Sequence, residues 1–344
     1  MNKLYTYILL FILVGTVYGC EKAAVESPGV KQEGDPIVLS SGYPVSTAET
    51  GTRAATNFPN NGSIGIVATK ELNEVAELTD WSKYEDISNR EAVATSVDAN
   101  GVYSFQWADN VTRYWPFDGS DLYFMAYSPI ADGTDNRYLI DEKKSSIFMN
   151  LHSDMPDVMY ASNNTANIPH NKTTGVVKLG EFRHALSQLT INVSAAVGLP
   201  EKITVSRLTV STSYGTATLS LPEGDNGLKP VEGEVYEAVL LNGITSLAST
   251  ISRDLLLFPG TEDATKISIT LYDSEIDYAF TGNYMISFFQ SDAPGQPILL
   301  EPGKNTELRI TVNLIDVQNP SETIDLKGRI TDWTYKGHFN IGIN

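Results

Sequence analysis

The chain has 344 residues and a formal net charge of -18, because 42 acidic residues outnumber 24 lysines and arginines. This length is enough for two domains of ordinary size. The acidity and the lack of a basic stripe argue against a nucleic-acid partner, since nucleic-acid binding depends on clustered Lys and Arg.

The first residues have the organisation of an export signal. A positive charge near the start is followed by an almost wholly apolar stretch from Leu4 to Val17, which suits a signal peptide and is short for a membrane span. Gly19 precedes Cys20, the only cysteine of the chain. This arrangement resembles a bacterial lipobox, in which the thiol receives a diacylglycerol. We therefore predict a signal peptide at 1–19 and a lipoprotein acylated (palmitate) at Cys20; the alternative is an ordinary secretory signal with an incidental cysteine.

The segment after the signal changes character twice. Residues 20–36 are polar, broken by proline and without periodicity, which predicts a flexible lipid tether. The apolar run "PIVLSSGYPV" then predicts a first strand at 37–45. Polar residues 46–60 predict a long loop, in which Arg53 and Ala54 have no hydrophobic anchor nearby. The Arg53–Ala54 bond is therefore a candidate processing site for a protease, and the alternative is an ordinary surface arginine.

The rest of the chain consists of short segments in which apolar and polar residues alternate between turn signals. Predicted strands lie within 63–69, 101–110, 120–129, 188–195, 266–273, 307–316 and 323–333. Alternation of period two at this spacing predicts antiparallel sheets packed as sandwiches. The predicted class is all-β, with an N-terminal β-sandwich domain at 37–180 and a C-terminal one at 181–344.

The segment "WTYKGHFNIGIN" predicts one more short strand. Phe339, Ile341 and Ile343 alternate with small or polar residues, which gives the strand a single apolar face. A turn at 336–337 precedes it, so this strand could leave its own domain and be donated to another molecule. The alternative is an ordinary last strand paired within its own domain.

Motifs for catalysis, cofactors or metals do not emerge from the sequence. No serine lies in a G-x-S-x-G motif, and no phosphate-binding loop or dinucleotide fingerprint occurs. The histidines share no metal-ligand spacing; they are His152, His170, His184 and His338. We therefore predict that the protein is not an enzyme and that it has no cofactor and no metal site.

Four segments, in this order, carry a family resemblance. They are "RYWPFDGSDLYFMAYSP" (113–129), "EFRHALSQLTINV" (181–193), "LEPGKNTELRITVNL" (300–314) and "ITDW" (330–333). Behind a lipobox, they resemble the fimbrillin-like family of the Bacteroidales, the subunits and accessory proteins of type V pili. The resemblance covers most of the chain after residue 35.

This resemblance implies two tandem transthyretin-like sandwich domains and export to the outer membrane as a lipoprotein. It also implies cleavage by an arginine-specific protease after the first strand, and assembly by strand donation between subunits. The matching bond in this chain is Arg53–Ala54, and the matching first strand runs from Ile37 to Val45. We expect a fimbrium subunit or accessory component in cell adhesion. Its partners would be other fimbrillin subunits, the outer membrane before processing, and a host or bacterial surface ligand.

A second class of protein would share the lipobox, the tether and the sandwiches. It is the surface glycan-binding lipoprotein of a polysaccharide-uptake system. Trp107, Trp115 and the many tyrosines could form its sugar-stacking face; otherwise these aromatic residues belong to the core or rim of a sandwich. A surface glycosidase has less support, because nothing singles out two carboxylates. The arginine loop and an insertable strand favour the fimbrial interpretation.

Overall fold

The computed structural model describes residues 35–41, 62–70, 87–99, 102–131, 133, 137–141, 145–161, 168–292, 295–313 and 324–332. The chain divides into two compact units, Met1–Asp35 and Pro36–Asn344, and every strand below belongs to the second. Several sequence predictions concern residues outside the described ones: Cys20 with the signal peptide, Arg53 and Ala54 with their loop, and Phe339, Ile341 and Ile343.

The elements follow one another along the chain as short strands with three-residue 3-10 helices between some of them. The strands are β1 (Leu39–Ser40), β2 (Ser63–Thr69), β3 (Arg90–Val97), β4 (Tyr103–Trp107), β5 (Tyr123–Ser128), β6 (Tyr138–Asp141), β7 (Ser146–Asn150), β8 (Met159–Ala161), β9 (Val177–Lys178), β10 (Phe182–His184), β11 (Ser187–Ala195), β12 (Ile203–Thr212), β13 (Thr216–Ser220), β14 (Leu228–Val231), β15 (Tyr236–Ser246), β16 (Ile251–Leu257), β17 (Thr265–Asp273), β18 (Tyr278–Met285), β19 (Gln290–Ser291), β20 (Lys304–Val312) and β21 (Ile324–Asp332). The 3-10 helices are η2 (Gly224–Asn226), η3 (Glu262–Ala264) and η4 (Ile286–Phe288).

The predicted all-β class is confirmed. The alternation in β11 shows why the prediction succeeds: Leu189, Ile191 and Val193 are fully buried, whereas Thr190 and Asn192 between them are partly exposed. Successive side chains of a strand point to opposite faces, so one face of β11 enters the core and the other carries polar groups.

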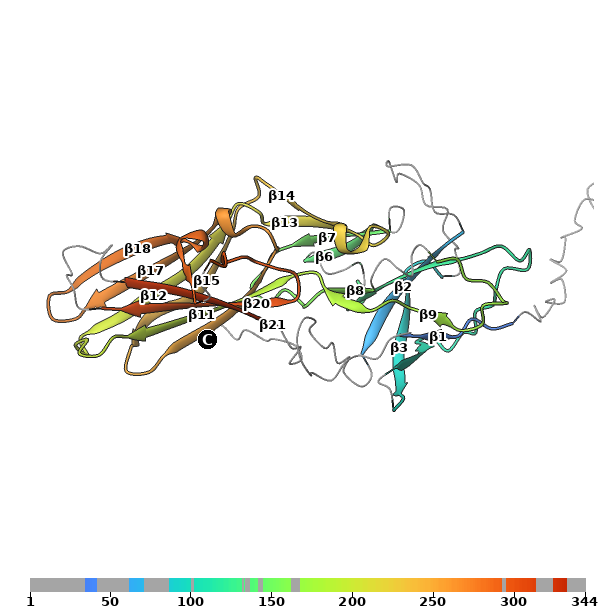
Figure 1. The fold of residues 1–344 in the computed structure, drawn as a ribbon, viewed down its shortest axis with the longest axis horizontal. Coiled ribbons are helices and arrows are strands. Elements are labelled where there is room, and N and C mark those ends of the chain that lie inside the picture. The colour runs from blue at the N-terminus through green and yellow to red at the C-terminus, as the bar shows by residue number, and fades with distance from the viewer. Residues whose placement is uncertain are drawn as a thin grey trace, which may run out of the picture. The chain divides into compact units, whose positions relative to one another are not determined.

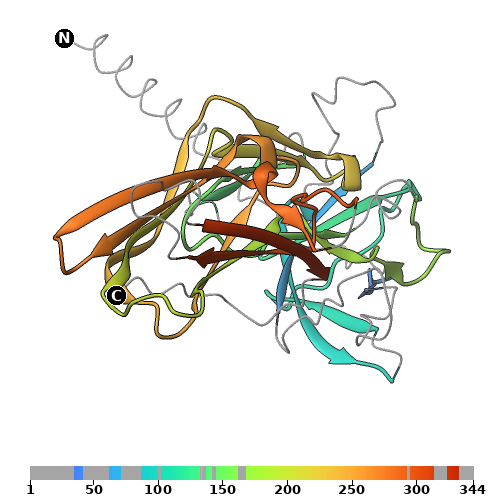
Figure 2. The ribbon, with the colours of Figure 1, turned by 60° about the vertical axis from the view of Figure 1, so that its left-hand side comes forward.

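Four sheets are formed by the strands that the structure describes (Figure 1). Their strand orders are β10-β8-β5-β2-β3-β4-β1-β9, β16-β11-β20-β21-β19, β15-β12-β17-β18 and β14-β13-β7-β6. Most neighbours are antiparallel, as predicted, but β1 and β9, β11 and β20, and β19 and β21 run parallel. Alternation gives the face of each residue and not the direction of its partner, so these parallel pairs could not be predicted. Figure 2 shows one antiparallel pair, β20 and β21, as adjacent red strands.

The eight-stranded sheet curls until its two ends approach each other. Its end strands, β9 and β10, are consecutive in the chain and are joined by residues 179–181 only. Because each extended residue spans at most about 3.6 Å, this link cannot bridge the two ends of a flat sheet. The strand β1 lies next to the β9 end and pairs on both sides, so it is not an edge strand.

Two hydrophobic cores lie on opposite sides of this sheet. In β5, Phe124 and Ala126 contribute to one core while Met125 and Tyr127 contribute to the other, which explains why this strand is apolar on both faces. The first core contains Ile37, Leu39 and residues of β2 to β5, β8 and β9. The second core extends through the sheets of the C-terminal half.

The predicted boundary near residue 180 falls in the link between β9 and β10. β10 belongs to the eight-stranded sheet, and the hairpin β6–β7 pairs with β13 from beyond the boundary. Pairing therefore crosses residue 180 in both directions, and the division into domains at 37–180 and 181–344 stays a prediction.

Candidate functional site: the slot held by strand β1

The candidate site is the position between β4 and β9 that residues Ile37–Ser41 occupy, here called the β1 slot. The backbone of these residues is bonded on both sides. On the β4 side, the amide of Ile37 donates to the carbonyl of Arg113 at 2.8 Å, and the amide of Ser41 donates to the carbonyl of Tyr103 at 2.9 Å. On the β9 side, the amides of Val177 and Leu179 donate to the carbonyls of Val38 and Ser40, each at 2.8 Å. Figure 1 shows β1 and β9 side by side.

The side chains of this segment alternate between the core and the surface. Ile37, Leu39 and Ser41 are buried, while Val38 is 48% exposed and Ser40 is partly exposed. Burying a side chain the size of Ile or Leu stabilises a fold by about 1.5–3 kcal/mol. Two such side chains are worth about 3–6 kcal/mol, which is a large share of the 5–15 kcal/mol that stabilises a typical domain.

The start of the slot is fixed by an ion pair on the adjacent segment. The Arg113 side chain is only 7% exposed; its guanidinium lies 4.6 Å from the centre of the Trp107 ring and 2.6 Å from the Asp109 carboxylate. Hydrogen bonds from Arg113, together with the amide of Val111, hold the pKa of Asp109 well below its usual range. Because the carbonyl of Arg113 accepts the bond from Ile37, this pair holds the backbone at the place where the slot begins.

Loss of β1 would leave more than one edge unpaired. Among the strands that the structure describes, β9 pairs with β1 alone. Removal of β1 would therefore leave β9 without a strand partner and one side of β4 without its hydrogen bonds. The core would be open at the sites of Ile37 and Leu39. Bare backbone groups beside an apolar cavity are a template for another strand, and β-strand addition uses such edges for binding.

The sequence predicted two strands of this site, β1 and β4, and missed the third, β9. The first strand predicted at 37–45 is confirmed at residues 39–40, with Ile37 and Leu39 buried, while 42–45 lie outside the described part. The partner β9 was missed because it is only two residues long and lies in the segment interpreted as a boundary. The signal for β9 that the sequence did contain was the segment "GVV" directly before Lys178.

The alternative aromatic site is not on the surface. Trp107 and Trp115 are 7% and 6% exposed, and Trp115 packs edge-on against Phe124 with ring centres 6.0 Å apart. Both tryptophans are therefore core residues, and neither is available to a sugar-stacking face.

Each described histidine has a local partner. The Nδ1 of His170 lies 2.8 Å from the carbonyl of Ile168, and burial lowers the pKa of this imidazole. His184 lies 2.7 Å from Asp157, and both side chains are buried. His152 contacts Asp154 at an exposed position. Within the described ranges, no group of three or more His, Cys, Asp or Glu side chains could hold a metal ion.

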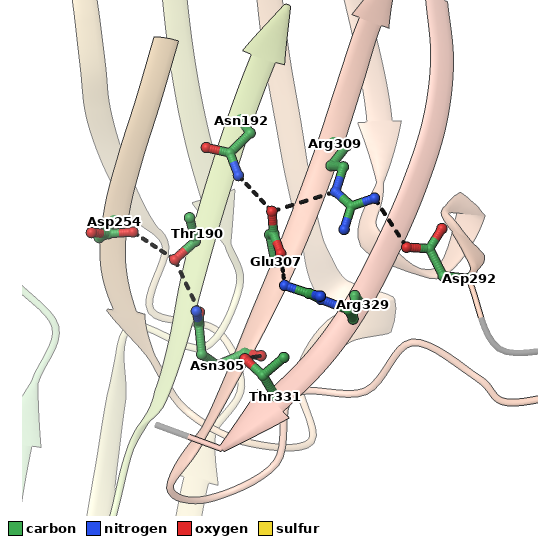
Figure 3. Close-up of polar contacts among 9 residues, drawn as sticks. All are labelled: Thr190, Asn192, Asp254, Asp292, Asn305, Glu307, Arg309, Arg329 and Thr331. Carbon is green, nitrogen blue, oxygen red and sulfur yellow. Dashed lines mark hydrogen bonds and ion pairs between the residues drawn. The ribbon is translucent and has the colours of Figure 1, made fainter. Parts of the chain in front are cut away.

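A polar ladder covers the outer face of the sheet that contains β21 (Figure 3). Glu307 on β20 accepts hydrogen bonds from Asn192 at 2.9 Å and from Arg329 on β21 at 2.8 Å. Arg309 lies 3.1 Å from Asp292, and Thr190 donates to Asp254 at 2.6 Å. Burial would raise the pKa of Glu307, but the hydrogen bonds and charges of Arg309 and Arg329 lower it overall. These contacts join β11, β20 and β21 side to side.

The comparisons with known proteins agree with this architecture. The model of the family described as fimbrillin-like matches residues 52–333. The chain therefore belongs to the fimbrillin-like family. No curated protein matches the sequence.

None of the helices in the described ranges is long and apolar enough to cross a membrane.

Two solved structures share the fold. A candidate cell adhesion protein from Bacteroides uniformis is 18% identical, with a TM-score of 0.55, over 88% of this chain and 99% of that one. A second candidate cell adhesion protein, from Bacteroides ovatus, is 13% identical with a TM-score of 0.50, again over 88% of this chain and 99% of that one. At these identities the likeness supports the all-β fold.

Proposed function

We propose that the protein is a structural, non-catalytic subunit or accessory component of a cell-surface fimbrium. It is exported as a lipoprotein, activated by cleavage after Arg53, and assembled by β-strand donation. Membership of the fimbrillin-like family supports the fimbrial role. The observation that carries the proposal is the β1 slot, a pre-formed strand position that is filled from one end of the chain and bordered by two strands.

The position of Arg53 links cleavage to the slot. Arg53 lies between β1 and β2 in the sequence. Cutting the Arg53–Ala54 bond therefore breaks the covalent connection of β1 to β2 and all later strands. The released piece would hold both Cys20 with its lipid and the strand β1. A single cut therefore breaks the covalent link between the subunit and the outer membrane, and the subunit is freed when another strand displaces β1 from the slot.

The segment that fills the slot comes from another subunit. Phe339, Ile341 and Ile343 give it an alternating apolar face, the pattern that Ile37 and Leu39 present to the core. Main-chain bonds supply affinity and the side-chain sites supply register, as in other cases of strand addition. The partners are thus other fimbrillin subunits, and adhesion to a host or bacterial ligand follows from assembly at the cell surface.

Limited digestion of the full chain with an arginine-specific protease tests the processing step. Arg53–Ala54 should be cut first, and the core fragment should begin with "AATNF". Arg113, Arg183 and Arg309 are engaged in ion pairs and should be cut later. N-terminal sequencing that places the first cut elsewhere, with Arg53 intact, would remove the processing hypothesis.

A further inference from the structure

The three inward positions of the β1 slot differ in chemistry. Ile37 and Leu39 are 4% and 2% exposed and lie within the apolar core. The third inward residue, Ser41, is also only 2% exposed, but its side chain is a hydroxyl. The slot is therefore apolar over two positions and polar at the third.

The hydroxyl of Ser41 completes the backbone pairing at the end of β4. The amide of Ser41 donates to the carbonyl of Tyr103 at 2.9 Å, and Oγ of Ser41 accepts from the amide of Tyr103 at the same distance. A side-chain oxygen thus takes the place that a backbone carbonyl has in a regular ladder. A buried amide without an acceptor is costly, so a residue at this position must provide one.

The outward positions make no comparable demand. Val38 is 48% exposed and lies beside Val176, which is 41% exposed, because β1 and β9 are paired in parallel. Ser40 is partly exposed as well. Selectivity of the slot must come from the inward side chains.

We infer that the β1 slot selects its incoming strand by a five-residue pattern: apolar, any, apolar, any, small hydroxyl. The strand enters antiparallel to β4 and parallel to β9, as β1 does. This inference rests on the proposed function, in which β1 is replaced, and it specifies the chemistry of the replacing segment. A large apolar side chain in the third site would overfill it and would leave the Tyr103 amide without the oxygen that Ser41 provides.

The pattern also sets the register of the 339–343 segment. If Phe339 occupied the Ile37 site, Ile343 would enter the Ser41 site, which the inference forbids. With Ile341 and Ile343 in the sites of Ile37 and Leu39, the segment matches the two apolar positions of the pattern, and no residue of 339–343 enters the Ser41 site.

A displacement assay on the full chain tests the pattern. A sequence-specific protease site unrelated to arginine is placed in 46–60, the chain is cut, and the resident fragment carries a fluorescent label. Synthetic peptides of residues 35–42 then compete for the slot. The wild-type and Ser41→Thr peptides should displace the fragment equally within about threefold, and Ser41→Ile should be at least about tenfold weaker. Ser40→Ile, the same change at an outward position, should match the wild-type peptide.

Two outcomes separate the inference from the proposed function. Equal displacement by the Ser41→Ile and Ser40→Ile peptides would overturn the pattern and leave strand exchange intact. If no peptide displaces the fragment, strand exchange itself is contradicted, and the pattern is then tested in the uncut chain. In the uncut chain, Ser41→Ile should speed hydrogen exchange of the Tyr103 amide at least about tenfold relative to Ser40→Ile, and equal rates would overturn the inference.

Discussion

The hydroxyl of Tyr160 on β8 donates a 3.0 Å hydrogen bond to the carboxylate of Asp225 in η2. Arg183 on β10 contacts the same carboxylate. The connection between β13 and β14 is thereby tied to two strands of the eight-stranded sheet. Burial, and then the charge of Asp225, raise the pKa of Tyr160, so the phenol remains a donor at neutral pH.

Replacing Tyr160 with Phe removes this hydrogen bond and keeps the ring. We expect the free energy of unfolding to fall by about 0.5–1.5 kcal/mol, the usual net contribution of one hydrogen bond. Urea denaturation of the full chain measures the change. Tyr278→Phe is the control, because Tyr278 is 51% exposed, and it should leave stability unchanged. A Tyr160→Phe variant as stable as the control would show that the contact does not hold the two parts together.

The anchoring of β1 is tested by truncating its buried side chain. Leu39→Ala should destabilise the uncut chain by about 2–5 kcal/mol, because it removes buried methyl groups and leaves a cavity. Val38→Ala, one residue away and on the exposed face, should cost less than about 0.5 kcal/mol. Equal effects of the two substitutions in urea denaturation would contradict the burial of β1 in the core.

The pH dependence of stability should report on Glu307. Its pKa is lowered in the folded protein, so the charged carboxylate contributes stability that is fully present above the unfolded pKa of about 4.3 and is lost as pH falls below it. Glu307→Gln should therefore flatten the fall of stability between about pH 5 and pH 3. Glu237→Gln is the control, because it removes a carboxylate from an exposed ion pair. The free energy of unfolding of this variant should fall with pH in parallel with that of the wild type. Three parallel curves would contradict the account of the polar ladder.

Local alternation predicted much of the fold and little of its pairing. β2 at Ser63–Thr69 coincides with its predicted range, and β17 and β20 lie within one to four residues of theirs. The parallel partners Leu189 and Thr306 are far apart in sequence, and nothing in either segment identifies the other. Pairing between distant strands is decided by packing of the whole sheet, which a single segment does not contain.

The candidate site was predicted on one side only. The run around Ile37 and Leu39 was recognisable because its apolar residues stand out between polar segments. Val177 and Leu179, which receive β1, belong to a short segment with turn residues before it, and their role follows from the curl of the sheet. Ser41 carries no signal in the sequence, since a serine at a strand end is usually a surface residue.

Lipidation of Cys20 is expected if the first residues are a lipoprotein signal. Metabolic labelling with an alkyne fatty acid should tag the wild-type protein and leave Cys20→Ala untagged. Two or three acyl chains anchor a protein stably where one chain binds marginally, so the wild type should also sediment with membranes. Equal labelling of both proteins would remove the lipid anchor from the proposal.

Strand donation is tested most directly by native gel electrophoresis of the full chain after cleavage at Arg53–Ala54. The wild type should form a ladder of oligomers, because the 339–343 segment of one molecule fills the β1 slot of another. Ile341→Asp combined with Ile343→Asp should be cut equally well and remain monomeric, since a carboxylate cannot enter the sites of Ile37 and Leu39. The matched control, Asn340→Asp with Asn344→Asp, changes the polar face only and should form the ladder. A ladder from the Ile341→Asp, Ile343→Asp variant equal to that of the wild type would contradict donation by this segment.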